Sequence, residues 1–501
     1  MTTSFPPAAA AGLAPLLMPA VAELVPPAWA GYRPLIVEAL DGFLGRLSGA
    51  RLDAIVAAQL ELPEDATAAA RVVALARACP SLHKLGQVLA RDRRLDAQLR
   101  VRLQTLESLP PETPAEVWLP LIRAEIGAVP HLEIAPQALA EASVAIVVPF
   151  ARHGGIAPDA RGVFKVLKPG IEAQLAEELA IWAELGDWLE ARSAELGLPE
   201  LPYRETLSGV QGLLLNEIRP ETEQAHLAAA CRRHAEDPNV LIPQPLEYCT
   251  PRLTAMTRID GDKITEATTG HRPRLARALY AALLAQPFWQ PQAQTMFHAD
   301  PHAGNLRVTA DGRLAILDWS LVAVLDREAR IALVRVVLAA LAQDGALFAR
   351  ALAALGRPVR EDALRALSAA ALAEVRTGRL PGFDWLLSVL DRAATTRALE
   401  FPESLVLLRK ALFTLAGVVA ELDADCGAVP LLLKHAFDAR SFDPRGFGPH
   451  VFAGDLGTLW LSGLPIAARW WAGYWQDWSG CRSCRCRAEV PGGGVRQDLH
   501  G

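Results

Sequence analysis

Three polar side chains that could handle a phosphate group and a metal ion lie close together in this sequence. The segment His298 to Asn305 (HADPHAGN) is followed, after a hairpin pattern, by Leu317 to Ser320 (LDWS). In phosphoryl transfer one Asp on a loop orients the attacking hydroxyl, a nearby Asn helps to hold magnesium, and a second Asp holds the metal between phosphates. Asp300, Asn305 and Asp318 have the residue types and the spacing for these roles. Their oxygen atoms are also the ligands that Mg2+ prefers.

Two other interpretations of the same residues stay open. The two loop residues are turn-capping types, and the later aspartate could end a strand. Alternatively, His298, Asp300 and His302 form a transition-metal cluster. Alternate residues share a face on a strand, but Pro301 disfavours a regular strand here.

A phosphoryl-transfer site of this kind also needs a cation earlier in the chain, because kinase-type sites use a lysine on a strand to grip the α- and β-phosphates. Lys165 lies within Val163-Phe164-Lys165-Val166-Leu167, an apolar strand pattern in which a charge needs a reason. A lysine that faces solvent from an edge strand is the alternative. Together with the downstream motif, the pattern predicts that Lys165 contacts phosphate.

A glutamate on a helix normally positions such a lysine. The candidates are Glu217 and Glu221, of which Glu221 is preferred. Their four-residue spacing places both on one face of a regular helix, although Pro220 interrupts it. Met256 ends a strand pattern and is expected at the hinge beside the adenine base.

The remaining patterns predict the elements that position these residues. Apolar runs at 144–148 and 163–167, with a turn-rich stretch between them, predict two paired strands. Strand patterns at 240–242 and 253–256 add to the same small mixed lobe, and 306–308 with 314–316 form a hairpin around Ala310-Asp311-Gly312. Helical spacing is found at 13–78, 81–108, 114–126, 171–196, onward to 233, and over most of 261–439. The fold class is therefore α+β.

Composition narrows the class of protein. The chain has 501 residues, of which 51% are hydrophobic, 21% charged and 6% aromatic, as is typical of a helix-rich globular protein. A net charge of -6 gives no basic excess for nucleic acid, which is not an expected partner. Seven cysteines, most of them scattered, indicate a reducing compartment. Prolines and charges interrupt the apolar runs, so neither a signal peptide nor a membrane span is expected, and the expected location is the cytoplasm.

Four motifs occur in the order known from one family of proteins. They are K-x-G-Q at Lys84-Leu85-Gly86-Gln87, followed by Leu103-Gln104 and Leu109-Pro110-Pro111, an alanine-rich loop at 140–145 (AEASVA), the lysine strand at 163–170 (VFKVLKPG), and the loop HADPHAGN. Together they resemble the UbiB family, the aarF-domain atypical kinase-like proteins linked to ubiquinone biosynthesis and isoprenoid lipid metabolism. The resemblance extends from about Ser81 to Asp326.

The resemblance implies a bilobal protein-kinase-like fold with a small mixed α/β N-lobe, a mainly helical C-lobe and additional N-terminal helices. It implies an N-terminal helical extension (1–80), a K-x-G-Q helical extension (81–130), an N-lobe (131–257), a C-lobe (258–440) and a Trp-rich C-terminal segment with a tail (441–501). The resemblance also implies that the K-x-G-Q extension packs over the active site, an arrangement that would hinder protein substrates and favour ATPase or lipid-linked activity.

The implied cofactors are ATP and Mg2+. The implied catalytic residues are Asp300 and Lys165, and the implied metal ligands are Asn305 and Asp318. The implied nucleotide-binding residues are Lys84, Gln87, Ala140, Ala142, Ser143, Lys165, Glu221 and Met256. An isoprenoid lipid or membrane surface and proteins of a quinone-biosynthesis complex are the implied partners, with peripheral attachment to a membrane.

Several positions depart from the family pattern. Glu141 places a negative charge in the alanine-rich loop, where it predicts weakened nucleotide affinity unless it points outward or meets magnesium. Trp319-Ser320 stands in place of Phe-Gly, and 146–148 (IVV) in place of Gln-Val-His. Two other functions therefore stay open: a small-molecule phosphotransferase of the aminoglycoside-kinase type, which shares the loop but not the K-x-G-Q motif, and a catalytically inactive nucleotide-binding scaffold.

The C-terminal segment carries two further patterns. Five tryptophans favour either a membrane interface or docking of a helix onto the large lobe: Trp460, Trp470, Trp471, Trp475 and Trp478. Cys481, Cys484 and Cys486 could contribute to a soft-metal site, although a fourth ligand is not evident nearby.

Overall fold

The computed structural model describes residues 25–90, 110–153, 160–199 and 203–437, together with isolated positions outside these ranges. The chain divides into two compact units. The first contains Met1–Ala278, His298–Val322 and Glu421–Asp423, and the second contains Leu279–Phe297, Ala323–Ala420 and Ala424–Gly501. Three sets of predictions lie outside the described residues: the helix over 91–108, the turn around 154–159, and the tryptophan and cysteine clusters of 441–501.

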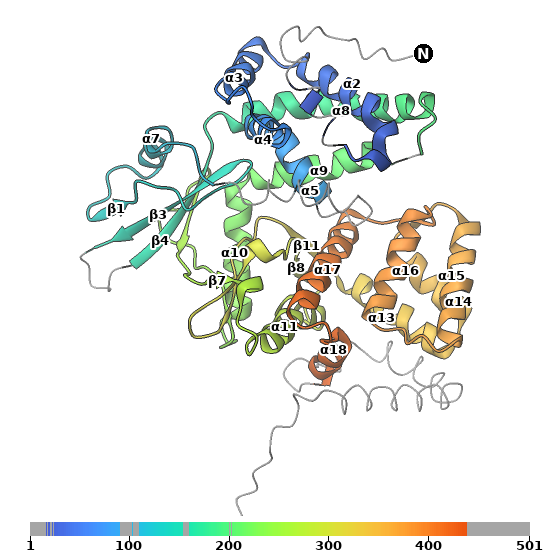
Figure 1. The fold of residues 1–501 in the computed structure, drawn as a ribbon. Coiled ribbons are helices and arrows are strands. Elements are labelled where there is room, and N and C mark those ends of the chain that lie inside the picture. Colours follow the sequence, from blue (N-terminus) through green and yellow to red (C-terminus); the bar gives the residue numbers. More distant parts are fainter. Residues whose placement is uncertain are drawn as a thin grey trace, which may run out of the picture. The chain divides into compact units, whose positions relative to one another are not determined.

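Helices of the first unit come before, within and after the strands of its first sheet. Their bounds are η1 (Pro27–Tyr32), α2 (Arg33–Leu44), α3 (Gly49–Leu60), α4 (Ala68–Ala78), α5 (Pro80–Ala90), α7 (Ala115–Ile126), α8 (Ile171–Glu195), α9 (Tyr203–Glu217), α10 (Pro220–His234), η3 (Ile264–Glu266), α11 (Arg272–Tyr280) and η5 (Ala303–Asn305). Helices α2 to α5 gather around α8 and α9 (Figure 1). Their shared core includes Phe43, Leu75, Trp182 and Leu214. The predicted helices at 114–126 and 171–196 are confirmed as α7 and α8.

The start of α5, the helix that carries the K-x-G-Q motif, is fixed by a buried carboxylate. Glu178 of α8 accepts a hydrogen bond from the backbone N–H of Ser81 at 2.9 Å and pairs with Arg51 of α3. Arg51 also donates to the Ala78 carbonyl at 2.7 Å. A carboxylate at a helix N-terminus satisfies a backbone N–H that has no partner within the helix. These bonds therefore tie three helices to the first turn of α5.

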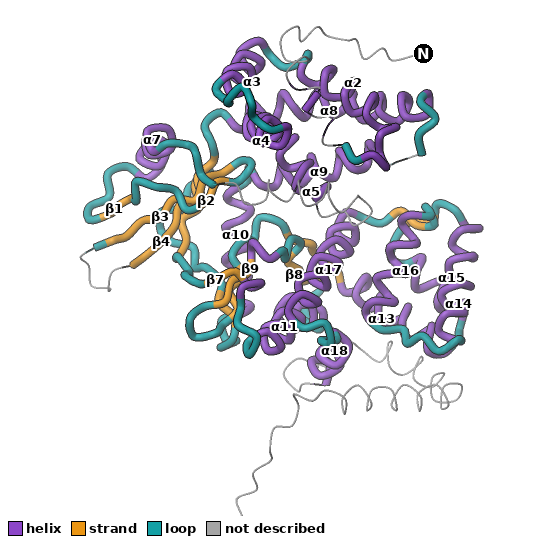
Figure 2. The backbone as a smooth tube through the Cα atoms, viewed as in Figure 1, coloured by secondary structure: helices purple, strands orange, loops and turns teal. Residues whose placement is uncertain are grey.

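The first sheet is antiparallel and has the order β1-β3-β4-β6, with β2 paired to β3. Figure 2 shows β2, β3 and β4 side by side. The strand bounds are β1 (Leu132–Ile134), β2 (Ala140–Glu141), β3 (Ala145–Arg152), β4 (Ala160–Leu167) and β6 (Leu253–Thr257). The predicted pair of strands is confirmed as β3 and β4, with Val147 opposite Lys165.

Alternation along β4 separates an apolar face from the face that carries the lysine. Phe164 and Val166 are buried in one cluster with Trp118 and Ile122 of α7. Successive strand residues point to opposite faces of a sheet. Lys165 therefore points away from the α7 cluster, so its charge does not enter that apolar core.

A second, four-stranded sheet has the order β5-β10-β9-β7. Its strands are β5 (Val240–Leu241), β7 (Asp262–Lys263), β9 (Leu306–Val308) and β10 (Leu314–Ile316). The predicted hairpin is confirmed, because β9 and β10 pair antiparallel and Gly312 in their turn has a φ of 79° that favours glycine. The strand pattern at 240–242 forms β5, which pairs in parallel with β10 of this second sheet.

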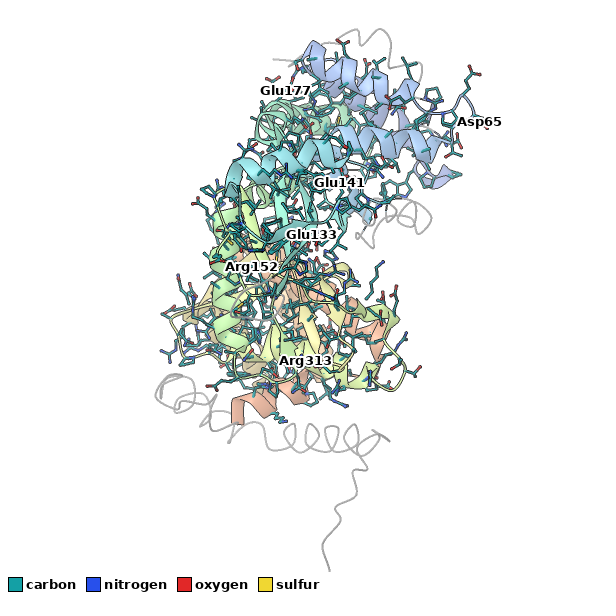
Figure 3. The ribbon with its side chains drawn as sticks, turned by 90° about the vertical axis from the view of Figure 1, so that its left-hand side faces the viewer. Asp65, Glu133, Glu141, Arg152, Glu177 and Arg313 are labelled. Atoms are coloured by element: carbon teal, nitrogen blue, oxygen red, sulfur yellow. The ribbon has the colours of Figure 1, made fainter. Side chains whose placement is uncertain are left out.

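Glu141 acts as a tether between three segments of the first unit. Its carboxylate accepts from the backbone N–H groups of Glu112 and Thr113, each at 3.0 Å, and from the Thr113 hydroxyl at 2.9 Å. Lys168 Nζ lies 2.8 Å from Glu141 Oε1. In Figure 3, Glu141 lies apart from Glu133 and Arg152, which mark the other end of β3. The negative charge of Glu141 is therefore balanced locally.

The second unit is mainly helical in the part of it that the structure describes. Its elements are the π-helix η4 (Ala281–Ala285), α12 (Gln286–Phe288), β8 (Gln294–His298), β11 (Val322–Asp326), α13 (Arg327–Ala342), α14 (Gly345–Ala353), β12 (Arg357–Pro358), α15 (Glu361–Arg376), α16 (Phe383–Thr395), β13 (Leu399–Glu400), α17 (Glu403–Leu422) and α18 (Ala428–Phe437). Strand β8 pairs with β11, and β12 with β13. Asp326 and Asp344 cap α13 and α14 by accepting from backbone N–H groups of their first turns.

A fully buried arginine organises the start of this unit. Arg330 of α13 donates to the backbone carbonyls of Phe288 at 3.0 Å, Gln290 at 2.6 Å and Gln292 at 2.6 Å. The guanidinium can serve several acceptors at once because its donors form a rigid, planar fork. It thereby fixes the irregular segment between α12 and β8.

We expect Glu141→Gln to lower the free energy of unfolding near pH 7 and to do so less as the solution is acidified. Burial alone would raise the pKa of Glu141, but the bonds from Lys168, Thr113 and Glu112 lower it from 4.5 to about 2. Stability from a lowered carboxyl pKa is present above the unfolded pKa and is lost as the pH falls through the folded pKa. The loss near pH 7 should be roughly 2 to 3 kcal/mol, as measured by urea unfolding.

The matched control is Glu133→Gln, because Glu133 has a side chain that is 76% exposed and pairs with His153 at the other end of β3. It should leave the unfolding curve unchanged at both pH values. A deficit of Glu141→Gln that is the same near pH 7 and at about pH 3 would show that the ionised carboxylate contributes nothing specific.

We expect Arg330→Met to destabilise the second unit by about 3 kcal/mol, because it leaves three backbone carbonyls without the donor that holds them together. Urea unfolding followed by circular dichroism measures this loss. Arg365→Met is the control, since Arg365 on α15 has a side chain that is 75% exposed. Equal effects of the two substitutions would contradict a structural role for the buried guanidinium.

Candidate active site

One ammonium group lies between two carboxylates in the first unit. Lys165 Nζ donates to Glu223 Oε1 at 2.7 Å and to Asp318 Oδ2 at 3.2 Å. Glu223 comes from α10 and Asp318 follows β10. The side chains of Lys165 and Glu223 are 13% and 5% exposed, whereas that of Asp318 is 33% exposed. The structure thus joins the predicted strand lysine to the predicted metal ligand after the hairpin.

The glutamate partner of Lys165 is Glu223, so the preference for Glu221 was wrong. Helix α9 ends at Glu217, and α10 begins at Pro220, which fits the first position of a helix because its missing N–H needs no partner there. Glu221 and Glu223 are two residues apart, which places them roughly 200° apart around the helix. Glu223 faces the sheet and is buried, whereas Glu221 is exposed.

A pattern in the sequence could have identified Glu223. It lies on the stripe of buried residues that α10 presents to the sheet, which continues through Leu227, Ala230 and His234. A carboxylate on the apolar stripe of a helix needs a buried partner. This assignment of Glu223 to the buried face requires a helix that begins at Pro220.

Charge coupling in this cluster shifts all three pKa values. Burial alone would lower the pKa of Lys165, but Asp318 and Glu223 hold it above its ordinary value, so the ammonium stays charged. Burial raises the pKa of Glu223 to about 7, a shift that Lys165 opposes and Asp318 reinforces. For Asp318 burial acts in the same upward direction, yet Lys165 and Ser320 keep its pKa well below its usual range. Asp318 is therefore an ionised, partly exposed carboxylate.

The loop between β8 and β9 is held by its own side chains. The backbone N–H of Asp300 donates to His298 Nδ1 at 3.2 Å, and Asn305 Nδ2 donates to the Asp300 carbonyl at 3.2 Å. The N–H of Leu317 donates to the Asn305 carbonyl at 2.9 Å. This last bond links the loop to the residue before Asp318, so the three residues predicted from the motif spacing belong to one connected structure.

Trp319 anchors the segment that follows β10. Its ring is buried and lies edge-on to His298 at 4.8 Å between centroids. His226 Nδ1 donates to the Trp319 carbonyl at 3.2 Å, and the N–H of Ser320 donates to Asp318 Oδ1 at 2.8 Å. Ser320 is not among the described non-glycine residues with positive φ. The backbone conformation at position 320 therefore does not require glycine, and serine is accommodated there.

A second ion pair brings the K-x-G-Q helix to the alanine-rich turn. Lys84 of α5 pairs with Glu217 at the end of α9, and Ser143 Oγ donates to the other oxygen of Glu217 at 3.0 Å. Gln87 Nε2 lies 3.2 Å from His83 Nε2 on the same helix. Lys84 and Ser143 are thus joined through Glu217, a residue that was considered only as a partner of Lys165.

The remaining predicted nucleotide contacts lie on the first sheet. Ala140 in β2 and Ala142 in the following turn are exposed, and the N–H of Ala142 donates to the Ala145 carbonyl at 2.8 Å. Met256 is buried in β6 opposite Val163. Contact of these residues with a nucleotide remains a prediction.

The histidines of the loop are used for turns and not for a transition metal. His302 Nδ1 accepts from the N–H of Gly304 at 3.1 Å, much as His298 accepts from Asp300. No group of three or more His, Cys, Asp or Glu among the described residues could hold a metal ion. The alternative of a His298–Asp300–His302 metal cluster is therefore wrong.

The residues do fit Mg2+ bound jointly with phosphates. Asn305 uses its Nδ2 to donate to the Asp300 carbonyl, so the amide oxygen Oδ1 points away from that carbonyl. Asp318 supplies an ionised carboxylate. Magnesium is usually held by one or two protein oxygens together with phosphates and water. A site with these two ligands is therefore adequate for that ion.

The family model and the curated relatives that match this chain all describe kinase-like proteins. Residues 111–352 match the ABC1 atypical kinase-like domain. The chain is 27% identical over 373 residues to "Probable protein kinase UbiB" of Marinobacter nauticus, covering 70% of this chain and 66% of that protein. It is 30% identical over 285 residues to "Protein ACTIVITY OF BC1 COMPLEX KINASE 1, chloroplastic" of Arabidopsis thaliana, covering 53% of this chain and 39% of that protein.

The aligned region thus spans less than two thirds of the length of these two relatives. A solved structure of Rv3197 with erythromycin from Mycobacterium tuberculosis is similar at a TM-score of 0.44 and 16% identity, over 75% of this chain and 87% of that one, a likeness too weak to add to the family match. The expected kinase-like α+β fold is confirmed by the family match. Residues 111–352 therefore carry an ABC1 atypical kinase-like domain, and curated relatives similar to about 70% of this chain are named UbiB.

Proposed function

We propose that this protein binds Mg-ATP and either hydrolyses ATP or transfers its γ-phosphate to a small or lipid-linked acceptor. Lys165 grips the α- and β-phosphates, Asn305 and Asp318 hold Mg2+, and Asp300 orients the nucleophile, which is water or a hydroxyl. The observation that carries this proposal is the shared ion pair of Lys165 with Glu223 and Asp318. A charged lysine with an ionised aspartate beside it is the arrangement that phosphate and metal require.

The local charges support the binding of a metal together with the nucleotide. Lys165 carries one positive charge against the carboxylate of Asp318 and the partly protonated Glu223, so a divalent cation complements the cluster. Mg2+ supplies electrostatic stabilisation of the charge on the transferring phosphoryl group. The chain's own groups position the phosphates and the nucleophile.

Two departures from the family pattern do not oppose this function. Glu141 directs its charge to Lys168 and to backbone N–H groups, so its repulsion of phosphates is offset. Ser320 donates its N–H to Asp318 and so supports the carboxylate. These contacts favour the enzyme over the inactive scaffold, and the family match favours it over a phosphotransferase of the aminoglycoside-kinase type.

The proposed acceptor and cellular role rest on the resemblance to UbiB proteins. Relatives named UbiB motivate a role in isoprenoid-quinone or other lipid metabolism, with proteins of a quinone-biosynthesis complex as partners. Among the described residues, no helix combines the length and apolar character that crossing a bilayer demands. Contact with a lipid is therefore proposed as peripheral attachment to the membrane surface.

Asp318→Asn should abolish Mg2+-dependent ATP hydrolysis, with a fall in turnover of about a hundredfold or more, because a neutral amide is a poor substitute for a metal-binding carboxylate. Phosphate release by the purified protein, with and without liposomes, measures the effect. Stimulation by liposomes supports a lipid-linked role.

Asp311→Asn is the matched control for this measurement. Asp311 lies in the turn of the same hairpin, where it contacts Thr309 and Arg313, and its side chain is 54% exposed. Turnover should be unchanged in this variant. Nucleotide binding by the wild type without turnover under any condition would favour the scaffold, and equal loss in both variants would indicate damage to the hairpin.

A further inference from the structure

We propose that His302 is a positioning residue that holds the carboxylate of Asp300 in its productive orientation; this inference rests on the proposed function. His302 Nε2 lies 3.6 Å from Asp300 Oδ2, and the two side chains are 24% and 15% exposed. The separation is longer than a direct hydrogen bond. Catalytic hydrogen bonds are often long without substrate and shorten in the reacting complex.

The loop backbone sets the orientation of the imidazole. The N–H of Gly304 donates to His302 Nδ1 at 3.1 Å, so Nδ1 serves as an acceptor and carries no proton. In that tautomer the proton of the neutral ring is on Nε2, the nitrogen that faces Asp300. The ring is thereby arranged as a hydrogen-bond donor towards the aspartate.

Gly304 also leaves the space in which this ring lies. A Cβ atom on Gly304 would lie 2.8 Å from His302 Cε1 and 2.9 Å from Nδ1, which is closer than real contacts allow. Gly304 is not among the described glycines with positive φ, so its backbone is compatible with alanine. The glycine is therefore needed for the space that the imidazole occupies and not for conformational freedom.

This role differs from those already assigned to the loop. His298 is buried against Trp319 and supports the backbone of Asp300, whereas His302 faces the carboxylate itself. His302 faces the aspartate proposed to orient the nucleophile, whereas Lys165 is the residue proposed to grip the phosphates, so loss of His302 should affect the chemical step more than nucleotide binding. A carboxylate that loses its orientation makes a poorer acceptor for the proton of the nucleophile.

Two amide substitutions separate the two nitrogens of the imidazole. Asn places an oxygen where Nδ1 stands and so keeps the bond from Gly304, but its NH2 group does not reach Asp300. Gln places an NH2 group near the position of Nε2 and can donate to Asp300. We expect His302→Asn to lower kcat for ATP hydrolysis by about 10- to 100-fold with KM for ATP within about twofold, and His302→Gln to retain most of the wild-type kcat.

A double-substitution cycle tests the role of Gly304. Gly304→Ala should displace the ring and lower kcat about as far as His302→Ala does. In the His302→Ala background the added methyl group meets no imidazole, so Gly304→Ala should cause no further loss. The thermal unfolding midpoints of all variants are measured beside kcat, and His153→Asn, at the exposed end of β3, is the control.

Either of two results overturns the inference: wild-type kcat in His302→Asn, or equal losses in His302→Asn and His302→Gln at native unfolding midpoints. Additive losses in the Gly304 cycle likewise contradict it. If the wild type hydrolyses ATP and Asp318→Asn does not, these outcomes reject the role of His302 alone. If the wild type shows no turnover, the proposed function fails and the inference fails with it.

Discussion

The charge of Lys165 is the constraint on which the first unit depends. An ammonium group on a central strand of a sheet is costly unless carboxylates reach it, because burial opposes its charge. Glu223 and Asp318 come from elements far apart in the sequence, and together they offset the cost of burying the charged lysine. The alternation of β4, the start of α10 and the hairpin β9–β10 are thus determined together by one cation.

Other buried or partly buried carboxylates near the site also bind donors from segments that are far apart in the sequence. Glu217 joins Lys84 to Ser143, and Glu178 joins the start of α5 to α3. In both cases one carboxylate serves donors from two segments, so the helix with the K-x-G-Q motif is held at two points along its length. Unusual residues in the family pattern are accommodated in the same way, since Glu141 meets a lysine and backbone donors instead of phosphate.

Local patterns in the sequence predicted much of the fold and the acidic half of the site. Strands β3 and β4, helices α7 and α8 and the hairpin β9–β10 follow from periodicity and turn residues, which act over short distances. The pairing of β5 with β10 and the partner of Lys84 depend on contacts between residues far apart in the chain, which periodicity does not encode. The choice of Glu221 failed because Pro220 starts a new helix and so resets which residues face inward.

The joint at Pro220 has a mechanical consequence. Glu217 is the last residue of α9 and Glu223 lies in the first turns of α10, so the two carboxylates stand on either side of one short connection. One binds the lysine of α5 and the other binds the lysine of β4. A change in the angle between α9 and α10 therefore displaces both carboxylates at once. The two ion pairs therefore share one structural support, the short connection between α9 and α10.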